Sequence, residues 1–157
     1  MSRSRFTLLF FVVPALCRAD AGADFDAAAA RWKASGLQSY SFEYQYDSGD
    51  VVVPYCATAT IRVRVVKGAS TEPVVVKGSR HCPVGTRGRR SIDVAMPETI
   101  DALFDTMRRY VHNPPTPVEV KATFDSKYGF PILYFVSKLE VLDSGEGFRV
   151  SHFSVQR

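Results

Sequence analysis

The stretch YSFEYQY, residues 40–46, alternates aromatic and polar side chains without a break. A period of two is typical of a β-strand with one buried face. The aromatic positions on that face are Tyr40, Phe42, Tyr44 and Tyr46. Just before it, the alanine-rich residues 24–35 predict a helix with Asp24 as its N-cap and Gly36 at its end. The apolar side of this helix carries Phe25, Ala28, Ala29 and Trp32, so we expect the helix to cover the aromatic face of the strand.

The rest of the chain adds more strands and a second helix. The helix is expected from Pro97, which suits a first helical position, to His112. The further strands are expected at Thr58–Val66, Glu72–Lys77, Val118–Phe124, Ile132–Leu142 and Phe148–Val155.

The order α-β-β-β-α-β-β-β, with hairpin-length connections, predicts an α+β domain: an antiparallel sheet with two helices packed on one face. The likeness of Tyr46-Asp47-Ser48 to Phe124-Asp125-Ser126 suggests a duplicated unit. The strand Phe148–Val155 is expected at an uncovered edge, where another chain could pair with it.

Residues 1–21 have the three parts of a secretory signal peptide. Arg3 and Arg5 precede an apolar run from Phe6 to Leu16, and small residues follow at Ala19 and Ala21. The run is shorter than the roughly 20 apolar residues of a transmembrane helix. We expect cleavage after Ala21, which leaves residues 22–157 as a single periplasmic or secreted domain. Lipid attachment at Cys17 is the less favoured alternative, because Leu16 is larger than the residue that usually precedes a lipidated cysteine.

Removal of the signal changes the charge and the cysteine count. The net charge falls from +4 to +2, because Arg3, Arg5, Arg18 and Asp20 leave with it. This argues against nucleic acid as the partner. Cys56 and Cys82 remain, and in an oxidising compartment a disulfide between them is the natural interpretation; two separately buried thiols are the alternative.

The sequence resembles a bacterial exported family known as domain of unknown function 6174. The residues that carry the resemblance are Trp32, Gly36 to Phe42, Val63 to Gly68, Thr99 to Phe104, Phe124-Asp125 and Gly129-Phe130-Pro131. It spans about residues 31 to 153 and implies an exported location and an architecture, but no activity. Ser137 stands where many members of the family have an aspartate.

Two groups of residues are candidates for binding. Trp32, Tyr40, Tyr44 and Tyr46 form either a ligand-stacking face or, as alternation with polar residues favours, simply the core face of a strand. Lys77 and the segment 78–90 that follows it are rich in cationic side chains. These side chains would bind an anionic partner, or they would simply be solvated. These cations include Lys77, Arg80, Arg87, Arg89 and Arg90.

Catalytic signals are weaker. Asp125, Asp143 or Glu146 with His152 would be the residues of a periplasmic hydrolase, although turn capping explains the aspartates equally well. His81, His112 and His152 lack the spacing of a metal site, and no cofactor is expected. The sequence therefore favours a non-enzymatic module that binds an envelope protein or another anionic envelope component. The alternatives are a small-ligand-binding protein and a hydrolase.

Overall fold

The structure is a computed structural model that describes residues 21–47, 59–77, 99–139 and 145–156. Two helices and seven strands occur in these ranges. In chain order they are α1 (Ala21–Ser35), β1 (Tyr40–Asp47), β2 (Thr60–Val66), β3 (Ala69–Ser70), β4 (Val74–Lys77), α2 (Ile100–His112), β5 (Val118–Phe124), β6 (Pro131–Lys138) and β7 (Glu146–Val155).

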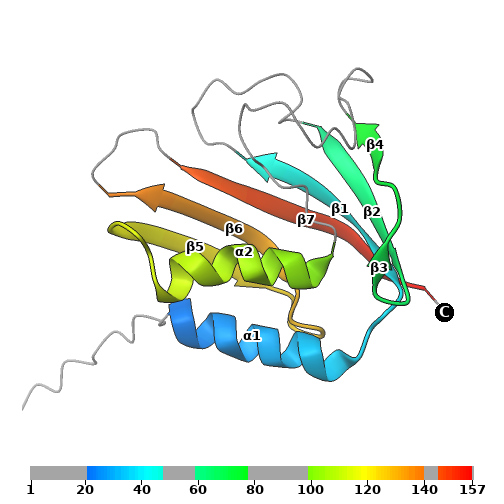
Figure 1. Cartoon of the computed structure of the whole chain (residues 1–157), viewed down its shortest axis with the longest axis horizontal. Coiled ribbons are helices and arrows are strands. Elements are labelled where there is room, and N and C mark those ends of the chain that lie inside the picture. Colours follow the sequence, from blue (N-terminus) through cyan, green and yellow to red (C-terminus); the bar gives the residue numbers. More distant parts are fainter. Residues whose placement is uncertain (1–20, 48–58, 78–98, 140–144, 157) are drawn as a thin grey trace, which may run out of the picture.

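The strands form one antiparallel sheet in the order β3-β2-β1-β7-β6-β5, and β4 also pairs with β2. Both helices lie on the same face of this sheet (Figure 1). The predicted α+β fold is therefore confirmed. The third predicted strand, Glu72–Lys77, corresponds to β4, which begins at Val74. The two-residue strand β3, which was not predicted, precedes it along the same edge of β2.

The helix starts differ from the sequence prediction. α1 begins at Ala21, so Asp24 lies in its first turn and is not the N-cap. α2 begins at Ile100, and its N-cap is Thr99, whose hydroxyl accepts a hydrogen bond from the backbone N–H of Ala102 at 3.1 Å. Pro97 lies outside the described residues. A threonine side chain supplies the acceptor that a free helix start requires, which explains why the helix starts there.

The position of β7 corrects another expectation. This strand is central, because it pairs with β1 from Asp47↔Gly147 to Tyr40↔Val155 and with β6 on its other side. The edges among the described strands are β5 on one side and β3 with β4 on the other. The prediction that Phe148–Val155 forms an uncovered edge was therefore wrong.

The predicted duplication has no counterpart in the symmetry of the sheet. The meanders β5-β6-β7 and β1-β2-β3 follow one another in the same direction across the sheet, while β7 and β1 run antiparallel. Both helices also lie on one face (Figure 1). The two units therefore have the same lateral order and the same helix face but opposite strand directions. Only a mirror reflection relates such units, and two segments of L-amino acids cannot be mirror images of each other.

Aromatic side chains fill the space between the helices and the sheet. Phe25 of α1 packs edge-on against Phe104 of α2, with ring centroids 5.6 Å apart. Trp32 packs edge-on against Tyr40 at 5.2 Å, and Phe130 stacks on Phe153 at 4.3 Å. The helix therefore covers the aromatic face of β1, as the alternation in residues 40–46 predicted.

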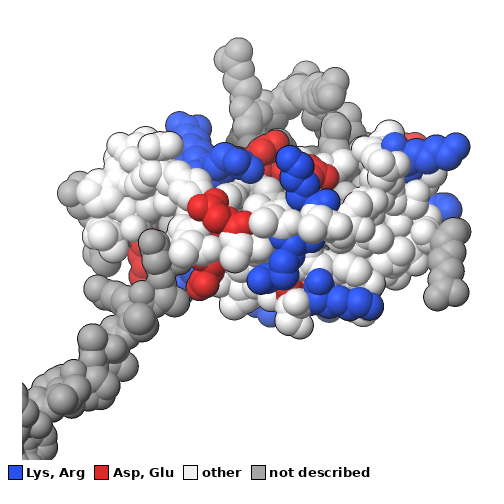
Figure 2. Space-filling model, turned by 90° about the horizontal axis from the view of Figure 1, so that it is seen from below, with Lys and Arg blue, Asp and Glu red and all other residues white. Residues whose placement is uncertain are grey.

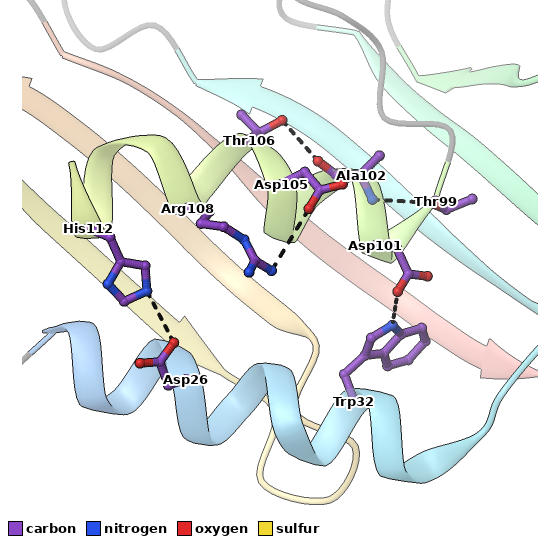
Figure 3. A network of polar contacts seen from close by, with 9 residues as sticks. All are labelled: Asp26, Trp32, Thr99, Asp101, Ala102, Asp105, Thr106, Arg108 and His112. Atoms are coloured by element: carbon purple, nitrogen blue, oxygen red, sulfur yellow. Dashed lines mark hydrogen bonds and ion pairs between the residues drawn. The ribbon is translucent and has the colours of Figure 1, made fainter. Parts of the chain in front are cut away.

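Polar contacts fix the two helices to one another (Figure 3). The indole N–H of Trp32 donates to Oδ1 of Asp101 at 3.2 Å, near the start of α2. At the other end of α2, Nε2 of His112 lies 3.1 Å from Oδ1 of Asp26. These two contacts join α1 to α2 near both ends of α2. They keep the two helices together as one layer on one face of the sheet.

Candidate functional site

The face of the sheet turned away from the helices is polar, and we call it the basic sheet face. Its members follow from the register, because residues opposite each other on neighbouring strands share a face. One row runs Lys77, Thr60, Gln45, Arg149, Leu133 and Thr123 across the sheet. The next rows contain Val74, Arg62, Glu43 and Ser151, and then Arg64, Ser41 and Ser154.

Cations outnumber carboxylates on this face. The carboxylate of Glu119 lies 3.4 Å from Nζ of Lys121. The other carboxylate among the described side chains of this face, that of Glu43, lies 2.6 Å from Nη2 of Arg62. Among the described residues, Arg64, Lys77 and Arg149 are exposed and have no carboxylate partner. The face therefore carries a surplus of positive charge that is available to an anionic partner.

Glu43 lies at the centre of the face and is only 9% exposed. Its Oε1 accepts from Arg62, and its Oε2 lies 3.1 Å from Nδ1 of His152. Burial of a carboxylate is costly unless it is paired and hydrogen-bonded, and both oxygens of Glu43 are in contact with a donor group. The result is a fixed cluster of Arg62, Glu43 and His152, which joins β2, β1 and β7.

His152 reaches Glu43 because the backbone of β7 is irregular there. The register of β1 and β7 shifts between Ser41 and Glu43, and His152 has a φ of +50°. An extra residue in the left-handed conformation defines a bulge that usually contains glycine. The bulge directs the imidazole to the helix-free face, and 76% of its surface remains exposed.

The predicted ligand-stacking residues lie mainly in the core. Trp32, Tyr40 and Tyr44 are each no more than 5% exposed. For these three residues the alternative that the aromatic side chains form the core face of the strand is therefore correct. Tyr46 is half-buried, and its hydroxyl donates to Oε2 of Glu146 at 3.3 Å. Only this end of the stripe is near solvent.

Several tyrosine hydroxyls gather at that end of the sheet. Burial raises the pKa of Tyr44 above its ordinary value, and the proximity of Tyr46 and Glu146 adds to the effect. Burial also raises the pKa of Tyr134, and its hydroxyl is buried without a hydrogen-bond partner in the described part of the chain. A buried phenol of this kind stays protonated, and its lack of a partner lowers stability.

The other predicted binding residues are only partly placed. Lys77 ends β4 and lies on the basic sheet face, opposite Thr60. Arg80, Arg87, Arg89 and Arg90, and the cysteines Cys56 and Cys82 of the predicted disulfide, lie outside the described residues. The same holds for residues 1–20, which contain most of the predicted signal peptide and Cys17. These predictions stay as they were.

Of the acidic residues of the hydrolase alternative, the two that the structure describes, Asp125 and Glu146, do not contact His152. Oδ1 of Asp125 accepts from the backbone N–H groups of Lys127 and Tyr128, at 3.0 and 2.6 Å, so this aspartate caps a turn. Glu146 contacts Tyr46 on the helix side of the sheet, and Asp143 lies outside the described residues. His152 contacts Glu43, which the sequence analysis did not single out. Within the described ranges, no group of His, Cys, Asp and Glu side chains has the arrangement of a metal site.

The residues that sequence reasoning missed are Glu43, Arg62, Arg64 and Arg149. The sequence did indicate that Glu43, Arg62 and Arg64 face away from the core, because each of them alternates with the inward-facing residues of its strand. The pairing of β1 with β7 was the missing information, and it depends on contacts between residues far apart in the chain.

The opposite side of the molecule has a different charge pattern. Figure 2 looks onto the side where α1 lies, and acidic and basic side chains are intermixed there. Asp24 and Asp26 are exposed near the start of α1, and Arg31 and Lys33 are exposed near its end. An anionic partner therefore has less reason to choose this side than the basic sheet face.

Comparisons with known proteins gave a match to one family model. A family model described as a family of unknown function (DUF6174) matches residues 24–155. The comparisons with curated proteins and with solved structures found no significant match.

Proposed function

The chain belongs to the DUF6174 family of unknown function, and we propose that it is a non-enzymatic module that binds an acidic protein in the cell envelope. The observation that carries the proposal is the unpaired positive charge of Arg64, Lys77 and Arg149 on a sheet face that the described helices leave open. Charge complementarity of this kind selects partners and speeds their encounter.

The chemistry of the face favours a protein over a lipid surface. Arginine, which is enriched in protein interfaces, supplies three of its cations, and the planar guanidinium matches a carboxylate with two parallel hydrogen bonds. Apolar side chains are interspersed, since Leu133 and Phe135 are half-buried and Val74 is 60% exposed. Among the described residues, neither helix is long and apolar enough to cross a membrane.

The place of action in this proposal is the periplasm or the cell exterior, to which the predicted signal peptide would direct the chain. The cationic segment 78–90 follows directly on Lys77, which lies on the basic sheet face. In this proposal the predicted cationic segment and the basic sheet face act on one partner.

The test uses charge reversal with a matched control. The variant Arg64→Glu/Arg149→Glu reverses two cations of the basic sheet face, and Arg31→Glu/Lys33→Glu makes the same change in net charge on α1. Binding of a fluorescent oligo-aspartate peptide is followed by anisotropy at several salt concentrations. We expect the face variant to lose at least about tenfold in affinity and the control to bind as the wild type does, because the attraction is local.

The outcomes separate the alternatives. Equal losses in both variants would show a general charge effect and would contradict the proposal. Binding to vesicles that contain anionic lipids, with no binding of the peptide, would assign the face to a membrane surface and would also contradict it. The thermal unfolding midpoint of each variant shows whether it is folded.

A further inference from the structure

We propose that His152 makes the basic sheet face a proton-coupled binding site, in which the imidazolium binds a carboxylate of the partner through Nε2–H. This inference rests on the proposed function, because it specifies how the same face recognises its acidic partner. It assigns a specific role to the most exposed member of the Arg62, Glu43 and His152 cluster.

The contacts of Glu43 determine which nitrogen faces outward. Oε2 of Glu43 lies 3.1 Å from Nδ1 of His152, and its Oε1 lies 2.6 Å from Nη2 of Arg62. A carboxylate only accepts hydrogen bonds, so a hydrogen bond across this contact requires the proton on Nδ1. The inference places that proton on Nδ1 in both states of the ring. The hydroxyl of Ser151, 3.3 Å from the same nitrogen, is the other neighbour in contact. Nε2 is therefore left for the partner.

The protonation state then decides what Nε2 offers. In the neutral ring with its proton on Nδ1, Nε2 has a bare lone pair, which repels a carboxylate. In the imidazolium, Nε2 carries a proton and a share of the positive charge, and it donates a charge-assisted hydrogen bond. Binding of a carboxylate there must take up a proton whenever the free protein is neutral at His152.

The backbone supplies an independent reason to regard the side chain as functional. His152 adopts a φ of +50°, a conformation in which glycine would be unstrained. Outliers of this kind are concentrated at functional sites. The strained bulge has one evident consequence, which is that it holds an exposed imidazole over a buried carboxylate on the basic sheet face.

The experiment measures the affinity of the oligo-aspartate peptide at pH 7.5 and pH 5.5 at constant ionic strength. Aspartates remain largely ionised over this interval, because their ordinary pKa is about 3.9. We expect the wild-type affinity to rise several-fold at the lower pH, with an upper bound of about tenfold per pH unit for one proton. His152→Gln should bind equally at both pH values.

His112→Gln is the matched control, because His112 also lies 3.1 Å from a carboxylate but belongs to the helix side. This variant should keep the wild-type pH dependence. If the peptide binds and charge reversal weakens binding, but the affinity is the same at both pH values or His152→Gln keeps the dependence, the inference is overturned and the proposed function stands. If the peptide binds at neither pH, both are overturned.

A second measurement needs no partner. Long-range nitrogen–proton correlation spectra of the free protein at pH 8 report which ring nitrogen carries the proton. We expect the neutral ring of His152 to carry its proton on Nδ1. A neutral ring with its proton mainly on Nε2 would overturn the inference whatever the peptide does.

Discussion

At the scale of single residues, Gly129 explains one motif of the family resemblance. It has a φ of +85°, and a Cβ at this position would collide with the carbonyl oxygen of Ala28 and the side chain of Arg31 on α1. The turn after β5 can approach α1 only because this side chain is absent. Phe130 next to it is buried against Phe153, so the motif serves packing and needs no catalytic explanation.

We therefore expect Gly129→Ala to lower the free energy of unfolding by about 2 kcal/mol or more, from overpacking and from the left-handed backbone. Gly36→Ala is the control, because Gly36 also has a positive φ, +61°, but open space around its Cβ position. Its loss should be only about 1 kcal/mol. Urea denaturation measures both, and equal losses would contradict the packing explanation.

The strain at His152 yields a second prediction at this scale. His152→Gly should relieve about 1–2 kcal/mol of left-handed backbone strain. It also removes the contact of the imidazole with the buried carboxylate of Glu43, which keeps Arg62 as its partner. We expect the free energy of unfolding to stay equal or to rise, while binding of the acidic peptide loses its pH dependence. A clear decrease in stability would mean that the imidazole is structural.

At the scale of elements, Tyr40 joins β1 to the start of α2. The backbone N–H of Ile100 donates to the tyrosine hydroxyl at 3.1 Å, in a buried position. Tyr40→Phe removes this acceptor and leaves a buried N–H without a partner. We expect a loss of about 1–3 kcal/mol in the free energy of unfolding.

Tyr134→Phe is the matched comparison on β6. The hydroxyl of Tyr134 is buried and has no hydrogen-bond partner among the described residues. Its removal should leave stability unchanged or raise it by about 1 kcal/mol. Equal losses of stability in Tyr40→Phe and Tyr134→Phe would contradict the view that only the hydroxyl of Tyr40 makes a stabilising hydrogen bond.

Elements with strong local patterns could be predicted from the sequence, and their junctions could not. The alternation in residues 40–46 and 118–124 predicted β1 and β5, because one face of β1 is buried and one face of β5 is half-buried. The N-cap of α2 at Thr99 was missed, since Pro97 and Thr99 both suit a helix start and the contact of Tyr40 with Ile100 is visible only in the fold. The basic sheet face was missed for the same reason, because it is assembled from the pairing of β2, β1 and β7.

At the scale of the whole molecule, the buried tyrosines predict alkaline sensitivity. Burial raises the pKa of Tyr40 to about 12, and it also raises the pKa values of Tyr44 and Tyr134. Because the pKa in the folded state lies above the unfolded value near 10, the protonated phenols stabilise the fold fully below about pH 10. This contribution is lost as the pH rises through about 12.

We therefore expect the free energy of unfolding to fall between about pH 10 and pH 12. Phenolate absorbance in the near ultraviolet should show a late fraction of tyrosines that ionise together with the loss of the far-ultraviolet circular dichroism. Simple titration of all tyrosines near pH 10 with the fold intact would contradict the burial of these side chains.

The measurement that tests the central claim most directly is site-specific photo-crosslinking of the full-length protein in living cells. A photoreactive residue is placed at Gln45, exposed on the basic sheet face, or at Ala30, exposed on α1. The account predicts one dominant protein adduct from position 45, lost in Arg64→Glu/Arg149→Glu and kept in Arg31→Glu/Lys33→Glu. An adduct formed equally from both positions, or unaffected by the reversal of Arg64 and Arg149, would contradict it.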